Sequence, residues 1–143
     1  MTSIDIIVFG RPAPKGSKRH VGRGVMVESS KKVQPWREAV KFSARDVIDI
    51  TGWERLDGPV TIHVDFYFDP PKSAPKRRRT WPITRSSGDL DKLLRSTLDA
   101  LTDAGVMRDD SQVVHIDARK VHTSPDTLLT VPGALITVQA VTP

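Results

Sequence analysis

The sequence contains no cysteine among its 143 residues, and aromatic residues make up only 6% of it. The absence of cysteine excludes disulfide bonds and thiolate metal sites, and it is compatible with a reducing cytosol. No stretch approaches the roughly 20 apolar residues of a membrane span. The first residues also lack the basic region and the long apolar run of a signal peptide. We therefore expect a cytoplasmic protein that does not cross a membrane.

The charges that are present are predominantly basic. Lysine and arginine number 22 against 17 acidic residues, which gives a net charge of +5. An excess of positive charge favours a polyanionic partner, and nucleic acid is the usual one. The basic residues gather at 15–20 and 76–79, whereas acidic residues gather between 89 and 110. A chain of this length fits one domain, which we expect to span residues 1–143.

Hydrophobic periodicity predicts both helices and strands. Apolar residues alternate over 60–68, which predicts a strand with one buried face, and Leu90, Leu94, Leu98 and Leu101 recur at helical spacing. The order of elements favours an α+β fold, with two helices packed on one face of a mixed sheet of four to five strands. The expected strands are 4–9, 24–28, 60–68, 113–119 and 135–141, and the expected helices are 35–50 and 89–104, the second ended by Gly105.

Residues 69–88 form a long segment without periodicity that is rich in proline, lysine and arginine. We call it the basic loop. Loops of this length in compact domains are usually functional or disordered. This one leads directly into Asp89, so a nucleic-acid backbone that follows its positive charges would pass the acidic residues beyond it.

Two pairs of aspartates flank the second helix. Asp89 and Asp91 stand at its predicted start, and Asp109 and Asp110 precede the next strand. If that strand packs beside the start of the helix, three carboxylates converge, and they repel one another unless a cation lies among them. Oxygen ligands favour Mg²⁺ or Mn²⁺, which promote phosphodiester hydrolysis. The structural alternative is that Ser87 or Asp89 only caps the start of the helix, and that Asp109 and Asp110 only form a turn before the next strand.

These acidic segments resemble the signature of the RusA family of Holliday junction resolvases. The signature has the form Asp-x-Asp-Asn-x-x-Lys, then Asp-x-Leu, then Gly, then Asp-Asp-x-Gln-[Val/Ile]. The chain has Asp-Leu-Asp-Lys-Leu-Leu at 89–94, Asp-Ala-Leu at 99–101, Gly105 and Asp-Asp-Ser-Gln-Val at 109–113. Its segment 10–19 is also similar to the Pro-x-Pro-Lys-Gly opening of many members.

The resemblance implies a homodimer of α+β subunits that resolves four-way DNA junctions with Mg²⁺, for which Mn²⁺ is a substitute. It implies that the metal ligands are Asp89, Asp91 and Asp110, with Asp109 ranked fourth. A junction has two-fold symmetry, so a C2 dimer with one metal site per subunit makes two matching nicks most simply. The implied role is paired cleavage in DNA recombination and repair.

The chain departs from this signature at the essential lysine, where it has Arg95. Arginine keeps the positive charge and clamps a phosphate, but it does not easily donate a proton. Lys92 replaces the family's asparagine and offers an ammonium group one turn earlier. Either residue can supply the catalytic charge, and Arg95 can also pair with Asp91 and Asp99 along the helix.

The expected DNA contacts come from the basic loop and the N-terminal segment. Each neutralised phosphate releases a counterion and makes binding sensitive to salt. Trp81 lies within the basic loop, where it can stack on an unpaired base at a junction centre or pack against the dimer partner. The candidate DNA-binding residues are Lys15, Lys18, Arg19, Lys76, Arg77, Arg78, Arg79, Arg85 and Trp81.

Three functional hypotheses follow. The first is the Mg²⁺-dependent junction endonuclease. The second is a non-catalytic nucleic-acid-binding protein whose aspartates are helix caps. The third is a flap-specific or fork-specific nuclease built on the same site, which differs from a resolvase only in its preferred substrate.

Overall fold

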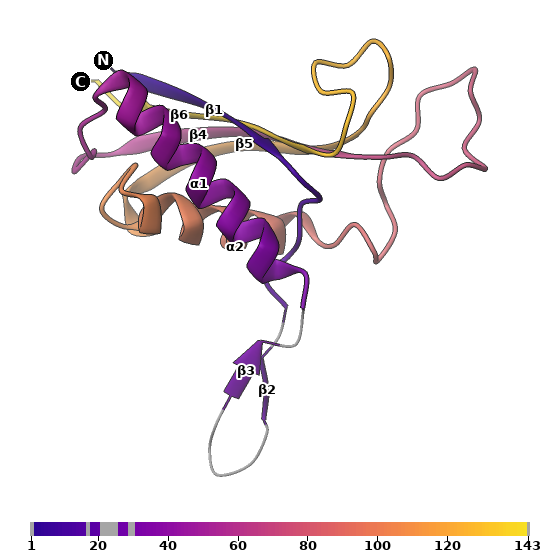
Figure 1. Cartoon of the computed structure of the whole chain (residues 1–143), viewed down its shortest axis with the longest axis horizontal. Helices are drawn as coiled ribbons and strands as arrows, with labels where there is room; N and C mark the ends of the chain where they lie inside the picture. The colour runs from indigo at the N-terminus through magenta and orange to yellow at the C-terminus, as the bar shows by residue number, and fades with distance from the viewer. Residues whose placement is uncertain (1, 17, 21–25, 29–30, 143) are drawn as a thin grey trace.

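The computed structural model describes residues 2–16, 18–20, 26–28 and 31–142, and these contain two long helices and two β-sheets (Figure 1). The strands are β1 (Ser3–Phe9), β2 (Lys18–His20), β3 (Met26–Glu28), β4 (Val60–Phe68), β5 (Val113–His122) and β6 (Gly133–Ala140). The helices are α1 (Val33–Thr51) and α2 (Leu90–Ala104), and a single 3₁₀ turn, η1 (Asp110–Gln112), precedes β5.

The main sheet has the strand order β1-β6-β4-β5. Strand β6 pairs antiparallel with both β1 and β4, whereas β5 runs parallel to β4. A parallel pair needs a long crossover connection, which here consists of the basic loop and α2. The predicted α+β class with a mixed sheet is confirmed, and the main sheet has four strands.

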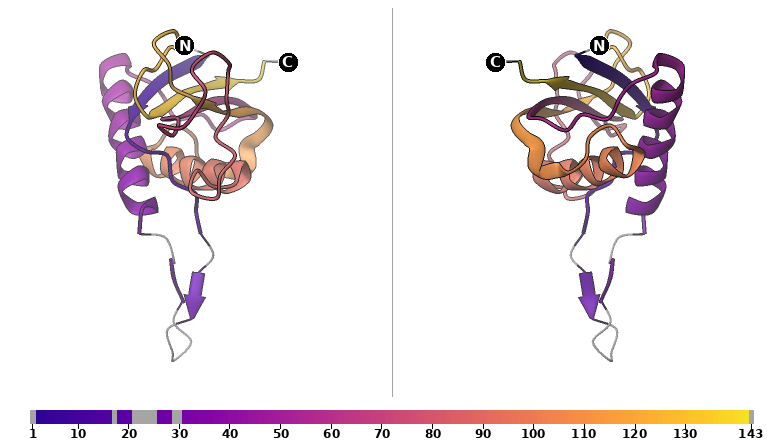
Figure 2. Two further views of the ribbon diagram at one scale, coloured as in Figure 1. Left: turned by 90° about the vertical axis from the view of Figure 1, so that its right-hand side faces the viewer. Right: turned by 90° about the vertical axis from the view of Figure 1, so that its left-hand side faces the viewer.

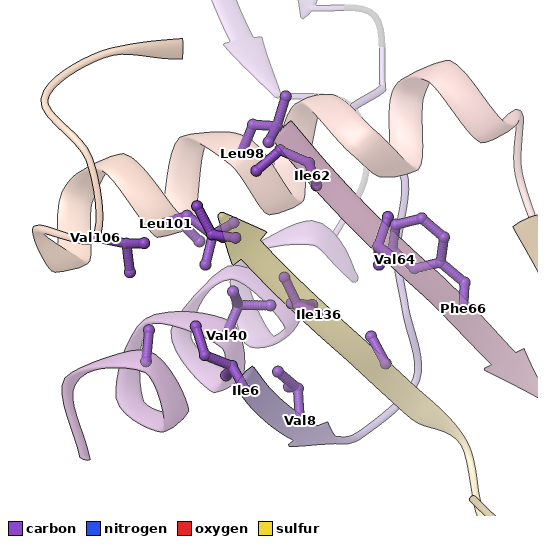
Figure 3. Packing of buried hydrophobic residues seen from close by; sticks show 14 of the residues in the cluster. Ile6, Val8, Val40, Ile62, Val64, Phe66, Leu98, Leu101, Val106 and Ile136 are labelled. Atoms are coloured by element: carbon purple, nitrogen blue, oxygen red, sulfur yellow. The ribbon is translucent and has the colours of Figure 1, made fainter. Parts of the chain in front are cut away.

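Both helices pack against the same face of the main sheet, where they form the core. Ile6 of β1, Val64 of β4 and Ile136 of β6 are buried on that face, together with Leu101 of α2 (Figure 3). On α1 the four-residue spacing of Trp36, Val40 and Ala44 produces one buried stripe. The indole Nε1 of Trp36 donates to Thr97 Oγ1 at 3.1 Å and joins the two helices.

The boundaries of the main elements lie close to the predicted ones. Helix α1 begins at Val33, two residues before the prediction, because Pro35 fits within a first helical turn. Helix α2 ends where Gly105 adopts φ of +90°, as predicted. The predicted strand 24–28 is present as Met26–Glu28, while residues 24 and 25 lie outside the described residues. Its partner β2 was not predicted, and the two strands project away from the main sheet (Figure 2).

The second face of β4 is more buried than its alternating sequence predicts. Asp65 and Tyr67 are both buried, although they lie opposite the helices. Arg119 of β5 donates to both carboxylate oxygens of Asp65, at 2.7 and 3.2 Å. Tyr67 packs with Val121 and Leu129, and Leu129 belongs to the segment between β5 and β6 that covers this end of the sheet.

Strand β5 forms one edge of the main sheet, and no strand in the described part of the chain pairs with its outer side. Residues 114–117 of β5 are exposed, including the apolar Val114 and Ile116. Neither α1 nor α2, the two long helices of the described residues, is both long and apolar enough to cross a membrane.

The packing of the core predicts a large loss of stability when a buried side chain of α2 is shortened. Leu101 is fully buried between the sheet and α1, so Leu101→Ala is expected to lower the free energy of unfolding by about 2–5 kcal/mol in urea titrations. Leu128 is 84% exposed, and Leu128→Ala is expected to change it by less than about 0.5 kcal/mol. Equal losses for the two variants would contradict the packing described here.

Candidate active site

The N-terminal end of α2 is held by the proline-rich segment that follows β1. Gly88 has φ of +84°, and a Cβ at this position would lie 2.6 Å from Pro14, so only glycine fits. The backbone N–H of Lys15 donates to the carbonyl of Lys92 at 3.0 Å. Ser96 Oγ donates to the carbonyl of Ala13 at 2.7 Å. These contacts place residues 13–15 along α2 and fix the backbone that leads into Asp89.

Asp89 and Asp91 lie at this end of α2 with exposed side chains. Asp89 occupies the N-cap position, but its carboxylate makes no capping hydrogen bond, and its side chain is 73% exposed. The ammonium of Lys92 lies 3.9 Å from Asp89 Oδ2. The structural alternative of a helix cap therefore does not account for the side chain of Asp89.

Lys120 reaches the same end of α2 from β5. Its ammonium donates to the carbonyl of Gly88 at 2.8 Å and to Ser87 Oγ at 3.1 Å. Burial lowers the pKa of Lys120, while the nearby carboxylate of Asp89 acts in the opposite direction. Lys120 thus places a positive charge behind Asp89 and holds the turn from which α2 starts.

Asp109 has a structural role at the other end of α2. Its carboxylate accepts a hydrogen bond from the backbone N–H of Ser111 at 2.9 Å, and Gln112 Oε1 accepts from the backbone N–H of Asp109 at 2.8 Å. This reciprocal capping box begins η1. The hydrogen bonds from Ser111 lower the pKa of Asp109. Asp109 therefore has a structural role in the turn before β5, which is the structural alternative for this pair of aspartates.

Asp110 differs from its neighbour because it faces α2. Its Oδ1 accepts a hydrogen bond from Thr102 Oγ1. Burial raises the pKa of Asp110, and the carboxylates of Asp99 and Asp109 raise it further, against the opposing hydrogen bond from Thr102. The ammonium of Lys15 lies 3.1 Å from Asp99 Oδ2. A shallow hollow of about 310 Å³ lies at this point of the surface. The residues that line it are Lys15, Arg37, Asp99, Thr102, Asp103, Asp109 and Asp110.

The structure brings Asp110 together with Asp99, and it does not bring Asp110 together with Asp89 or Asp91. Asp89 and Thr102 stand at opposite ends of α2, separated by roughly 20 Å at about 1.5 Å per residue. Within the described ranges, no three acidic or histidine side chains lie close enough to hold one metal ion. The premise that the next strand begins beside the helix start is wrong. Strand β5 begins at the C-terminal end of α2, and its Lys120 reaches the N-terminal end.

The predicted cationic residues have different surroundings. Arg95 is exposed, and among the described residues it forms no ion pair, so the expected pairing with Asp91 and Asp99 is not found. Lys15 pairs with Asp99 instead. The side chains of Lys18 and Arg19 lie outside the described part of the structure. The candidate DNA-binding residues of the basic loop are all exposed, and they are Lys76, Arg77, Arg78, Arg79, Trp81 and Arg85.

Sequence reasoning did not assign a site role to Asp99 or Lys120. Asp99 belongs to the Asp-Ala-Leu motif, and the motif itself was the available signal. Lys120 pairs in register with Phe66, so it occupies a position that faces the helices. A lysine at a core-facing strand position is unusual unless its charge has a partner, and that pattern would have identified it.

Carboxylates at the start of α2, next to a basic loop, are typical of enzymes that act on phosphodiesters. The sequence model of the endodeoxyribonuclease RusA family matches residues 10–131, which include both acidic groups and the basic loop. The chain therefore belongs to the RusA family, a family of endonucleases that resolve Holliday junctions. A comparison with curated proteins gave no match.

The surroundings of Asp110 predict how stability depends on pH. The pKa of Asp110 is raised in the folded state, so folding favours the protonated carboxyl group. The stability that this group contributes is fully present below its unfolded pKa, near 3.9, and is lost as pH rises through its folded pKa. Asp110→Asn cannot ionise and keeps an acceptor for Thr102. In chelator-treated protein, urea titrations from about pH 3 to about pH 7 are expected to show the variant gaining stability relative to wild type.

Asp46→Asn is the matched control, because Asp46 is an exposed residue of α1 that belongs to neither acidic group and does not line the hollow around Asp110. Its stability relative to wild type is expected to stay nearly constant over the same range. A constant difference for Asp110→Asn as well would contradict the burial of that carboxylate.

Proposed function

We propose that the protein is a Mg²⁺-dependent endodeoxyribonuclease that resolves Holliday junctions by paired symmetric nicks in DNA recombination and repair. Mn²⁺ is the expected substitute. The observation that carries the proposal is the half-buried pair of Asp99 and Asp110, in a chain of the RusA family. Two carboxylates that oppose each other's ionisation gain most from a bound cation.

The donor groups of this pair fit a hard divalent ion. The carboxylates of Asp99 and Asp110 and the hydroxyl of Thr102 offer only oxygen. Mg²⁺ is commonly held by one or two carboxylates together with waters and a phosphate. The second group, Asp89 and Asp91, also offers only oxygen, and it lies beside the exposed residues of the basic loop.

We propose that the metal ligands are Asp89, Asp91 and Asp110, as the resemblance implies, with Asp99 as a fourth. Because the two groups lie at opposite ends of α2, one chain does not complete this set. In a homodimer with two-fold symmetry, the Asp89 end of one α2 can face the Asp110 end of the partner's α2. The dimer would then contain two equivalent sites, one for each nicked strand.

Each part of the site has a defined task. The bound ion would activate a water molecule and stabilise negative charge on the leaving 3′ oxygen. Arg95, which has no ion-pair partner within the described residues, binds the phosphate through its guanidinium, and Lys92 adds an ammonium one turn earlier. Lys120 holds the carbonyl of Gly88, which orients Asp89. The basic loop and Lys15 bind the DNA backbone.

A single-residue test separates the nuclease from a non-catalytic DNA-binding protein. Asp91→Asn and Asp110→Asn are each expected to reduce nicking of a synthetic four-way junction by about two orders of magnitude or more, while binding in Ca²⁺ persists. The control Asp46→Asn is expected to cleave normally. Absence of cleavage by the wild-type protein with Mg²⁺ or Mn²⁺ would leave only the binding hypothesis. Parallel assays on flap and fork DNA separate a resolvase from a flap-specific or fork-specific nuclease.

A mixing test asks whether one site is shared between two chains. In a dimer of Asp91→Asn with Asp110→Asn, a shared arrangement places both substitutions in one site and leaves the other site intact. Random co-assembly of the two inactive variants is therefore expected to restore nicking to about a quarter of the wild-type rate. If each metal site is built within one chain, every site keeps one substitution and the mixture stays inactive. That result would contradict the shared site and leave the nuclease activity standing.

A further inference from the structure

A cavity in the described residues lies between the basic loop and one end of the main sheet. Its volume is about 630 Å³, within the range of sites that take small organic molecules. Neither the predicted metal ligands nor the acidic groups at α2 belong to it. Its lining includes Arg11, Phe68, Asp69, Arg79, Trp81 and His122.

The walls of this loop cavity offer flat apolar surfaces. Phe68 ends β4 and is buried, whereas Trp81 is 52% exposed and Ile83 is largely exposed. Pro82, which also lines the cavity, is buried. Exposed apolar side chains that lie together can form a binding surface. An indole next to a cavity is suited to stacking against a planar group.

Two arginines already stack on the aromatic rings of the cavity. The guanidinium of Arg79 lies 5.1 Å from the ring centre of Trp81, and that of Arg11 lies 5.6 Å from the ring centre of Phe68. Arg11 also donates to the carbonyl of Ser86 at 3.0 Å. The rim therefore combines aromatic faces with fixed positive charge, which complements a group that carries both a planar ring and a phosphate.

The polar groups of the lining match the edge of a base. Asp69 accepts a hydrogen bond from Thr123 at 2.7 Å and keeps further lone pairs. Thr80 Oγ1 lies 2.7 Å from His122 Nδ1. Burial lowers the pKa of His122 and so favours its neutral ring, which has one nitrogen that donates and one that accepts. Hydrogen-bonding groups of both kinds thus stand beside the apolar walls.

The cavity adjoins the proposed active site through the chain itself. Ser87 is part of its lining, and Gly88 and Asp89 follow directly. Lys120 donates to both Ser87 and Gly88, so the wall of the cavity and the start of α2 are held by one side chain. A nucleotide in the cavity would belong to the same DNA molecule that passes Asp89.

We propose that the loop cavity receives one unpaired nucleotide of the bound DNA, with its base stacked on Trp81 and its phosphate against the arginines of the rim. The inference rests on the proposed function, because it requires a DNA substrate. A paired base would first have to leave its duplex at a cost in unstacking energy, whereas an unpaired base pays little. The cavity would therefore favour branched or distorted DNA over continuous duplex.

The test is direct binding of a duplex with one unpaired 2-aminopurine, measured without divalent metal so that no cleavage occurs. Wild-type protein is expected to change the fluorescence of this base and to bind the bulged duplex more tightly than the fully paired duplex. Trp81→Ala is expected to abolish most of the fluorescence change and to weaken binding of the bulged duplex by about tenfold, the scale of one lost base–aromatic stack. Its affinity for the paired duplex is expected to remain close to that of wild type.

Two controls make the result specific. Trp81→Phe retains an aromatic face and is expected to keep most of the preference for the bulge. Phe42→Ala removes an exposed aromatic ring of α1 that is not part of the cavity, and it is expected to behave as wild type. Equal weakening of both duplexes by Trp81→Ala, or an unchanged fluorescence response, would overturn the proposal. Nicking of four-way junctions by wild type in Mg²⁺ would show that the nuclease function survives that failure.

Discussion

The parallel pairing of β4 with β5 is the constraint on which the acidic groups depend. Parallel neighbours cannot be joined by a tight turn, so the chain must cross the sheet, and α2 makes that crossing. The burial of Leu93 and Leu101 holds α2 against the core face. Since β5 starts at one end of α2 and sends Lys120 to the other, the same crossover separates Asp110 from Asp89 and supports both. The two acidic groups are therefore separated by the length of α2.

The same crossover supplies the surfaces that suit DNA. The basic loop connects β4 to α2, and it leads into the acidic start of the helix. The loop contributes its arginines, its exposed tryptophan and most of the lining of the cavity. Residues that are far apart in the sequence complete the arrangement. Arg11 contacts Ser86 and stacks on Phe68, and Pro14 packs on Gly88. The proline-rich segment after β1 therefore serves as the support of this loop.

Most of the fold followed from local patterns, and the site followed only in part. The strand at 60–68 and the helix ended by Gly105 were predicted because period and punctuation are local properties. The burial of Asp65 and Tyr67 was not, because it depends on Arg119 and on a later segment that covers them. The signature identified the family, but it carries no distance information. The placement of Asp110 beside Asp99 depends on the direction in which β5 leaves α2, which sequence spacing does not reveal.

The edge strand β5 has a consequence for the protein at high concentration. Its outer backbone groups face no neighbouring strand in the described part of the chain, and such rows are templates for edge-to-edge aggregation. Asp117 and Arg119 place exposed charge along the later half of this edge, which disfavours the addition of another strand. The earlier half contains Val114 and Ile116, both apolar and exposed. A lysine at position 114 or 116 would extend the charge over the whole edge. The substitution at position 114 would also leave the core face of the sheet unchanged.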